Sequence, residues 1–224
     1  MQYKLYHQEE NKQLILFFNG WAMTPETVER LIIPSGYDLL SVWDYREDNL
    51  DFDFTPYHSI ILCAWSMGVW AADKFCNSLS LPIEKAVAVC GTGYPCDDAY
   101  GIPEQIFRGT YDSLSQENRA KFNRRMCGGK SLRTLFEALE KRPTQEIKDE
   151  LGRVMSDEMG KSHPVPKLLA QGLWTRAFVG LKDRIIPPQN QINYWSGMNV
   201  EIVELDGEAH YAFSCFERWE ELWN

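Results

Sequence analysis

The chain has 224 residues, of which 44% are hydrophobic and 25% charged, and this composition suits one globular domain with a full core. Its formal net charge of -9 argues against a nucleic-acid-binding protein, because such a protein needs a basic face. No apolar run reaches the ~18 residues of a membrane span, and the N-terminal segment MQYKLYHQEENKQ lacks the apolar stretch of a secretory signal. We therefore expect a soluble cytoplasmic protein without nucleic-acid or membrane partners.

Short apolar runs recur along the chain and predict strands. They span residues 13–18, 37–43, 59–64, 85–90, 175–180 and 200–205. Helix-compatible segments lie between them: one begins with Thr24 as N-cap and Pro25 in the first turn, and others span residues 67–79 and 189–195. Strands that alternate with helices and are apolar throughout indicate an α/β fold, in which a mostly parallel central sheet carries helices on both faces.

Residues from about 104 to about 162 interrupt this alternation. The segments SQENRAKFNRRM, SLRTLFEALEKR and TQEIKDELGRVM favour helices, and no strand-like run lies among them. We expect residues 1–224 to form a single domain with this helical lid inserted between two strands. Residues 104–153 hold 11 Lys or Arg and 8 Asp or Glu, so the segment is slightly basic in an acidic chain. A solvated helical face and a docking surface would both explain this charge.

The cysteines have no CxxC spacing, and several lie within apolar runs. They are Cys63, Cys76, Cys90, Cys96, Cys127 and Cys215. This pattern favours buried free thiols over a disulfide framework. The sequence carries no recognisable set of metal ligands, and we expect neither a metal nor a cofactor.

The stretch LCAWSMGVWAA, residues 62–72, places a serine where an apolar strand turns into a helix. A sharp strand-to-helix turn of the pattern G-x-S-x-G exposes its serine above the sheet edge as a nucleophile. Here Ala64 and Gly68 flank Ser66, and both are small, as the close approach of strand and helix requires. An ordinary helix N-cap would also account for a serine at this position.

A serine nucleophile needs a histidine to accept its proton and a carboxylate to orient that histidine. Asp183 and His210 each follow a predicted strand, at the edge where open parallel sheets bind ligands. The three residues also occur in the recurrent chain order serine, acid, histidine. Asp206 is an alternative acid, although its place before Gly207 favours a turn. The other three histidines lie near the N-terminus, before a strand and in the lid segment.

Acyl transfer also needs hydrogen-bond donors for the oxyanion. The backbone N–H of Met67, next to the serine, is one candidate. The loop after the strand at residues 13–18 contains Asn19, Gly20 and Trp21, and the N–H of Trp21 is the second candidate. Asn-Gly is also common in ordinary turns. We expect the rings of Trp21 and Trp65 to form walls of the substrate pocket.

Four segments, FFNGWA, AWSMG, GLKDRIIP and DGEAH, occur in this order along the chain. Together they resemble the α/β-hydrolase superfamily, and more closely the BioG-type pimeloyl-[acyl-carrier protein] methyl ester esterases, from about Leu14 to the C-terminus. The BioH esterases, which do the same task, have His-Gly-Trp in the loop and Gly-Trp-Ser-Leu-Gly at the turn. This chain carries Asn19 and Ala64 at the two differing positions.

The resemblance implies a serine carboxylesterase of biotin biosynthesis, which hydrolyses the methyl ester of pimeloyl-[acyl-carrier protein] to pimeloyl-[acyl-carrier protein] and methanol. Ser66 would attack the ester, His210 would act as base and Asp183 would orient it. The partner, acyl-carrier protein, is acidic, so basic lid residues are expected to dock it. These residues are Arg119, Arg124, Arg125 and Arg133. Two alternatives stay open: a hydrolase of another small ester or thioester, and a non-catalytic binding protein on the same fold.

Overall fold

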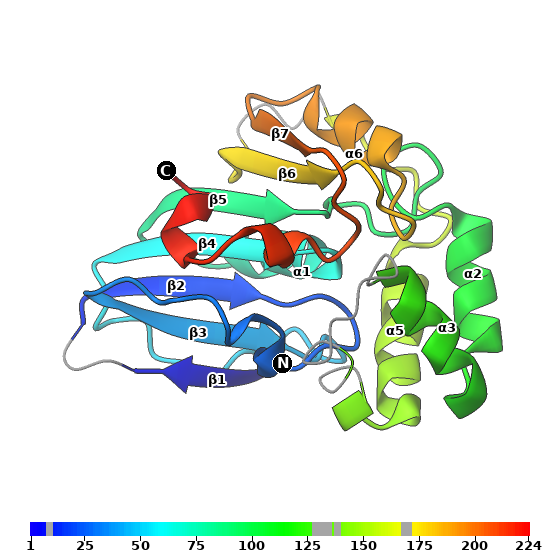
Figure 1. The fold of residues 1–224 in the computed structure, drawn as a ribbon, viewed down its shortest axis with the longest axis horizontal. Helices are drawn as coiled ribbons and strands as arrows, with labels where there is room; N and C mark the ends of the chain where they lie inside the picture. The colour runs from blue at the N-terminus through cyan, green and yellow to red at the C-terminus, as the bar shows by residue number, and fades with distance from the viewer. Residues whose placement is uncertain (8–10, 127–135, 137–139, 167–171) are drawn as a thin grey trace.

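The computed structural model describes residues 1–7, 11–126, 136, 140–166 and 172–224. Its centre is a seven-stranded sheet in the order β1-β3-β2-β4-β5-β6-β7 (Figure 1). The strands are β1 (Gln2–Tyr6), β2 (Gln13–Phe18), β3 (Tyr37–Trp43), β4 (Ser59–Trp65), β5 (Ile83–Val89), β6 (Arg176–Gly180) and β7 (Glu201–Leu205). Every neighbouring pair except β1 and β3 is parallel, which confirms the predicted mostly parallel sheet.

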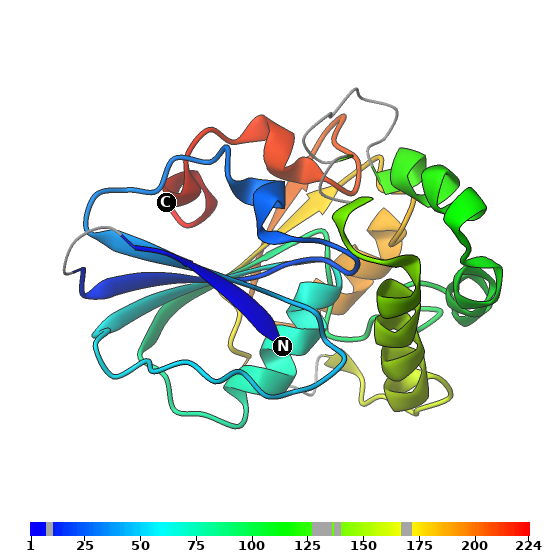
Figure 2. The same cartoon turned by 90° about the horizontal axis from the view of Figure 1, so that it is seen from below.

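Helices cover both faces of this sheet. The helices α1 (Met67–Cys76) and α6 (Pro188–Trp195) lie on one face, and the short 3-10 helices η1 (Pro25–Val28), η3 (Ala212–Cys215) and η4 (Trp219–Leu222) lie on the other. Figure 2 shows α1 below the sheet and the 3-10 helices above it. The predicted α/β architecture with two covered faces is therefore confirmed.

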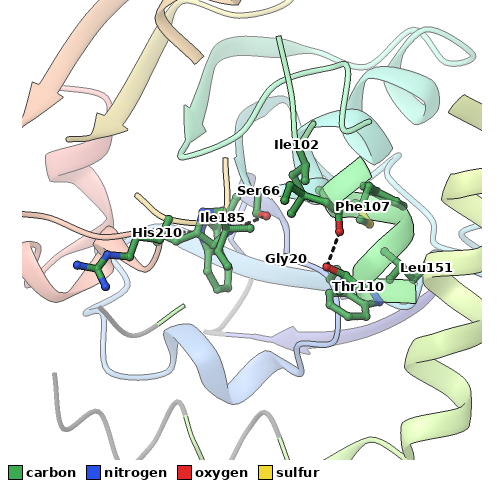
Figure 3. A pocket seen from close by; sticks show the side chains of 13 residues that line it. Gly20, Ser66, Ile102, Phe107, Thr110, Leu151, Ile185 and His210 are labelled. Atoms are coloured by element: carbon green, nitrogen blue, oxygen red, sulfur yellow. Dashed lines mark hydrogen bonds between the residues drawn. The ribbon is translucent and has the colours of Figure 1, made fainter. Parts of the chain in front are cut away.

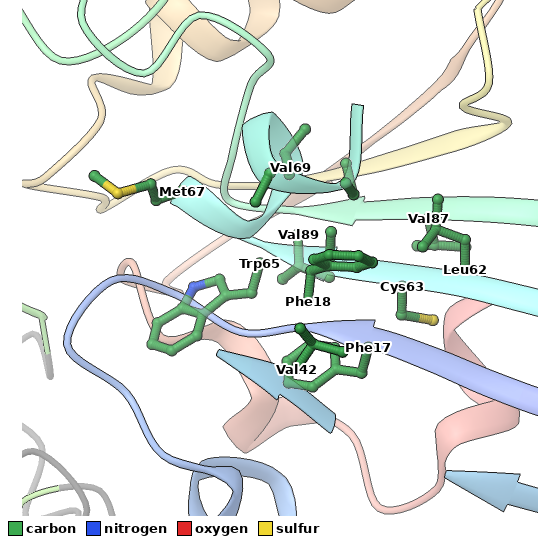
Figure 4. Close-up of a cluster of buried hydrophobic side chains, with 14 of the residues drawn as sticks. Phe17, Phe18, Val42, Leu62, Cys63, Trp65, Met67, Val69, Val87 and Val89 are labelled. Atoms are coloured by element: carbon green, nitrogen blue, oxygen red, sulfur yellow. The ribbon is translucent and has the colours of Figure 1, made fainter. Parts of the chain in front are cut away.

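The alternation of side chains along β2 explains why both faces are apolar. Phe17 points to the face of the 3-10 helices, where its ring packs edge-on against Phe213 and Trp219. Phe18 points to the opposite face (Figure 4). There its ring packs against Phe75 of α1. Both phenylalanines are fully buried, so the central strands anchor the two helical layers to one core.

Two elements at the margins differ from the prediction. No apolar run in the sequence indicates β1, which pairs antiparallel with β3 at the sheet edge and is mostly exposed. An edge strand needs no apolar alternation, and Lys4 on it suits an edge open to solvent. The helix predicted from Thr24 is only the single 3-10 turn η1. Thr24 has an extended backbone there, but its side chain makes no capping hydrogen bond.

The lid lies between β5 and β6 in the chain. Its described helices are α2 (Glu104–Ser113), α3 (Gln116–Met126) and α5 (Thr144–Glu158). Figures 1 and 2 show them beyond the carboxyl ends of the parallel strands, alongside the loops that leave those strands. Within the described residues, α2 and α5 contact each other and no strand of the sheet comes from this insertion.

The described cysteines are all free, and Cys63, Cys90 and Cys96 are buried, as predicted; Cys127 lies outside the described residues. Among the helices that the structure describes, none combines the length and the apolar character needed to cross a bilayer.

Asp73 on α1 gives the fold a pH-dependent stability. Burial raises the pKa of Asp73 to about 7, and the hydrogen bond from Trp174 Nε1 (2.7 Å) to its carboxylate offsets only part of that effect. In the unfolded chain an aspartate has a pKa near ~3.9. The folded protein therefore binds the extra proton between these two values, and stability falls as pH rises from about 4 through about 7.

We expect Asp73→Asn to remove this dependence, because asparagine keeps an acceptor for Trp174 and carries no charge. The two pKa values differ by the equivalent of about 4 kcal/mol. Since Asp73 keeps some solvent exposure, we expect the variant to be more stable than the parent by about 2 kcal/mol at pH 8 and equal to it near pH 4. Denaturant titrations at both pH values measure this, with the exposed Asp51→Asn as control; equal stabilities at pH 8 would contradict it.

Candidate active site

Ser66 occupies a sharp turn between β4 and α1. Its φ of 56° and ψ of -125° lie outside the regions that non-glycine residues normally adopt. The turn is held by a hydrogen bond from Ser66 N–H to the Val89 carbonyl (3.0 Å). The Ser66 side chain makes no capping hydrogen bond to α1, so the ordinary N-cap interpretation is wrong. The hydroxyl is available for chemistry.

Gly68 and Ala64 allow this turn to form. A Cβ at Gly68 would lie 2.3 Å from the carbonyl oxygen of Phe18 and 2.6 Å from that of Asn19, so only glycine fits without displacing the backbone. Ala64 is fully buried and pairs with Phe18 across β2 and β4. A methyl group is therefore tolerated at the strand position but not at the helix position.

The structure brings Ser66, His210 and Asp183 into one hydrogen-bonded line. His210 Nε2 lies 2.8 Å from Ser66 Oγ, and His210 Nδ1 lies 2.8 Å from Asp183 Oδ2. All three residues are buried, with 8%, 1% and 6% of their surfaces exposed in the order named. This arrangement can move a proton from the hydroxyl to the imidazole while the carboxylate stabilises the resulting charge.

Asp183 is fixed by more than the histidine. Its Oδ1 accepts hydrogen bonds from the N–H groups of Ile185 (2.7 Å) and Ile186 (3.1 Å), and its Oδ2 accepts one from Gln191 Nε2 (2.8 Å). These donors fix the orientation of the carboxylate beside His210. The alternative acid, Asp206, lies in a turn before Gly207, as its sequence position indicates.

Two buried residues, Trp65 and Cys90, contact the backbone of residues 209–210. Trp65 Nε1 donates to the His210 carbonyl (2.9 Å), and the indole and imidazole ring centres are 5.6 Å apart. The ring of Trp65 thus supports the backbone of His210.

Burial, and then the charge of Asp183, raise the pKa of Cys90 well above its usual value, so this thiol stays protonated and is no rival nucleophile.

Ser66 opens into a mainly apolar pocket beneath the lid (Figure 3). The pocket is lined by Gly20, Trp21, Trp65, Ser66, Met67, Ile102, Ile106, Phe107, Thr110, Leu151, Arg184, Ile185 and His210. Trp21 and Trp65, the two predicted wall residues, are both among them. The lid supplies side chains from α2 and Leu151 from α5. An apolar chain with an ester at its end fits such a lining.

The predicted oxyanion donors lie at this pocket. Met67 is the first residue of α1, so its N–H has no intrahelical acceptor, and no acceptor for it lies among the described residues. Trp21 lines the pocket from the loop after β2, and its indole Nε1 donates to the Ile147 carbonyl of α5 (2.7 Å). The roles of the two backbone N–H groups remain predictions.

The prediction missed several residues of the site. Arg184 is the only charged pocket residue, among those described, outside the serine, histidine and aspartate arrangement, and its place next to Asp183 in the sequence was an available signal. Gln191 and the lid residues had no such signal, because a glutamine or an isoleucine on a helix is ordinary. Their roles follow from tertiary contacts alone.

The docking surface predicted on the lid needs a correction. Arg119 is only 5% exposed, and its guanidinium donates to the Arg142 carbonyl (2.7 Å), so it is part of the lid's interior and its expected role at the surface is wrong. The side chains of Arg124 and Arg125, and the whole of Arg133, lie outside the described residues.

The parallel sheet with its lid, the strained turn at Ser66 and the line to His210 and Asp183 define an α/β-hydrolase. A family model described as "Pimeloyl-ACP methyl esterase BioG" matches residues 1–222. The chain belongs to this BioG family and is a carboxylic ester hydrolase.

Individual proteins are also similar to this chain. The crystal structure of BioG from Haemophilus influenzae is 39% identical, with a TM-score of 0.85 over 100% of both chains. A malonyl-[acyl-carrier protein] O-methyltransferase of Bacteroides fragilis is 40% identical over 207 residues, which are 89% of this chain but only 40% of the relative. A hydrolase from Pseudomonas aeruginosa, 15% identical with a TM-score of 0.68 over 96% of this chain and 88% of its own, shares the fold.

Proposed function

We propose that this enzyme hydrolyses the methyl ester of pimeloyl-[acyl-carrier protein] in biotin biosynthesis, with Ser66 as nucleophile. The observation that carries the proposal is the pair of 2.8 Å contacts that join Ser66 Oγ to His210 and His210 to Asp183 at the apolar pocket. Membership of the BioG family supports the choice of substrate.

In the first half of the reaction, Ser66 Oγ attacks the carbonyl carbon of the ester while His210 Nε2 accepts the hydroxyl proton. Asp183 holds the Nδ1–H of His210 and stabilises the imidazolium. The backbone N–H groups of Trp21 and Met67 stabilise the oxyanion of the tetrahedral intermediate. Collapse of this intermediate breaks the bond to the methoxy oxygen, and methanol leaves with the proton from His210.

In the second half, water attacks the acyl-enzyme. His210 accepts a proton from the water, and the second tetrahedral intermediate expels Ser66, which takes that proton back. The products are methanol and a free carboxylate on the acyl chain. In the proposed reaction the thioester to the carrier arm stays intact.

The B. fragilis relative supports a methyl ester on a carrier protein as the substrate. It is named for methyl transfer to malonyl-[acyl-carrier protein], and this chain matches 40% of its length. A methyl group placed on a carrier-bound acid has to be removed by an esterase before the acid can be used. We infer that the acyl-carrier protein is the partner of this chain, and that the basic residues Arg124, Arg125 and Arg133 of the lid contribute to docking it.

A comparison of two substrates tests the proposal. We expect the methyl ester of pimeloyl-[acyl-carrier protein] to be hydrolysed with a kcat/KM at least about tenfold above that of free dimethyl pimelate, since the carrier adds binding energy outside the pocket. Mass spectrometry of the carrier product identifies the bond that breaks. Cleavage of the thioester, or equal kcat/KM for both esters, would favour a hydrolase of another small ester or thioester.

A further inference from the structure

The loop that carries the Trp21 N–H is held by a tyrosine from the neighbouring strand end. Tyr45 follows β3, is 1% exposed, and its hydroxyl donates to the Asn19 carbonyl (2.5 Å). The N–H of Gly20, which belongs to the same peptide group, donates to Asn19 Oδ1 (3.1 Å). Both polar atoms of the Asn19–Gly20 peptide are therefore engaged, and its plane cannot rotate freely.

The orientation of the Asn19–Gly20 peptide influences the position of the Gly20–Trp21 peptide that follows it. The Trp21 N–H lies one peptide group further along, at glycine, where the backbone has the most freedom. Three other hydrogen bonds hold the loop: Asn19 N–H to the Val42 carbonyl (2.9 Å), Asn19 Nδ2 to the Thr24 carbonyl (2.9 Å) and Met23 N–H to the Gly20 carbonyl (3.3 Å). Loss of the Tyr45 hydroxyl would leave these in place and remove one of the two hydrogen bonds on the Asn19–Gly20 peptide.

Tyr45 is in turn held by the lid. Its N–H donates to Glu150 Oε1 of α5 (2.9 Å), and its carbonyl accepts from Arg153 Nη1 (3.2 Å). Glu150 is fully buried and its other oxygen accepts from Arg142 Nη1 (2.6 Å). Burial raises the pKa of the Tyr45 hydroxyl well above its usual value, so the hydroxyl remains a donor.

We propose that Tyr45 is a positioning residue for the oxyanion hole, and that α5 of the lid holds Tyr45 in place through Glu150. The inference rests on the proposed function, because it assigns the oxyanion to the Trp21 loop. In this proposal Tyr45 links α5 of the lid to the Trp21 N–H, the donor that acts on the reacting carbonyl. Neither residue stands out in the sequence, since a tyrosine after a strand and a glutamate on a helix are both common.

The variant Tyr45→Phe tests the first part. Removal of the hydroxyl leaves the Asn19–Gly20 peptide with one of its two hydrogen bonds, so the next peptide group is held less firmly and its Trp21 N–H stabilises the oxyanion less. We expect kcat to fall about 10- to 100-fold while KM changes less than about twofold, because loss of a whole donor costs 10²–10³ in kcat. Complete labelling with a fluorophosphonate counts the competent sites, so kcat is expressed per folded enzyme.

Tyr57→Phe is the matched control. Tyr57 is also buried, and its hydroxyl donates to Asp38 (2.7 Å) at the start of β3, the end of the strand remote from the site. Tyr57→Phe removes the same hydroxyl group as Tyr45→Phe and also breaks one buried hydrogen bond. We expect its kcat per labelled site to match that of the parent. If Tyr45→Phe keeps the parental kcat per site, or if both variants lose activity equally, the positioning role is overturned.

A pair of substitutions tests the role of the lid. Glu150→Gln retains an oxygen to accept the Tyr45 N–H, whereas Glu150→Ala removes it. We expect kcat per labelled site to fall about tenfold in the alanine variant and to be largely restored in the glutamine variant. Equal kcat in the two variants overturns the lid's part. Failure of the proposed function can be told apart from failure of this inference. If Ser66 is not the nucleophile, Ser66→Ala stays active whatever the result for Tyr45→Phe.

Discussion

Replacement of Ser66 with alanine is expected to lower kcat for the methyl ester by about 10⁵- to 10⁶-fold. The hydroxyl forms the acyl bond in the proposed mechanism, and no described side chain can take its place: the nearby Cys90 is fully buried, with a thiol held protonated. Residual turnover would come from the oxyanion donors acting on bound water. Stability should change little, since Ser66 Oγ makes its hydrogen bond only to His210 among the described residues.

Steady-state rates and fluorophosphonate labelling measure this effect. The parent should be labelled and Ser66→Ala should not. Ser41→Ala is a matched control: Ser41 is fully buried in β3, and its hydroxyl has no hydrogen-bond partner among the described residues. We expect that control to keep full activity. Labelling of the Ser66→Ala protein would point to another nucleophile, and an unlabelled parent would favour a non-catalytic binding protein.

Replacement of Asp183 with asparagine is expected to lower kcat by about 10⁴-fold. Oδ1 of Asp183 already accepts two backbone N–H groups, so the new amide nitrogen must take the place of Oδ2. There it would donate to His210 Nδ1 and leave the proton on Nε2, the nitrogen that must accept the proton of Ser66. It would also face the Nε2 donor of Gln191.

Asp206→Asn is the control for this variant, because Asp206 is the alternative acid considered from the sequence. It lies in the turn before Gly207 and outside the hydrogen-bonded line, so we expect kcat within about twofold of the parent. The comparison uses kcat at neutral pH, with circular dichroism to check folding. Similar losses in both variants would contradict the assignment of Asp183 as the orienting acid.

The site divides into residues that the sequence indicates and residues that it does not. Ser66, Asp183 and His210 each lie within five residues of the end of a strand, and parallel strands place their carboxyl ends at one edge. Local order along the chain is therefore enough to predict that they meet. The pocket wall from α2 and α5 is different, because the lid helices are amphipathic segments whose packing partners lie far away in the sequence.

The same division holds for the fold. Central strands such as β2 and β4 are buried on both faces, so their apolar runs are continuous and easy to identify. The edge strand β1 is exposed and polar, and only its pairing with β3 makes it a strand. The turn η1 had the start signals of a helix, but the chain then leaves to contact the C-terminal segment, where Ile32 pairs with Arg218.

The amino-acid sequence by itself determined the parallel sheet, the strained turn at Ser66 and the order of the three reacting side chains, because each depends on short-range patterns of apolar and small residues. Tertiary structure alone decided which residues fix that machinery in place: Gln191 on Asp183, Tyr45 on the Asn19 carbonyl and Glu150 on Tyr45. These are buried polar contacts between different elements, separated by eight residues for Gln191 and Asp183 and by 26 and 105 residues for the other two. Their partners are chosen by the packing of the folded core, which leaves no periodic trace in the sequence.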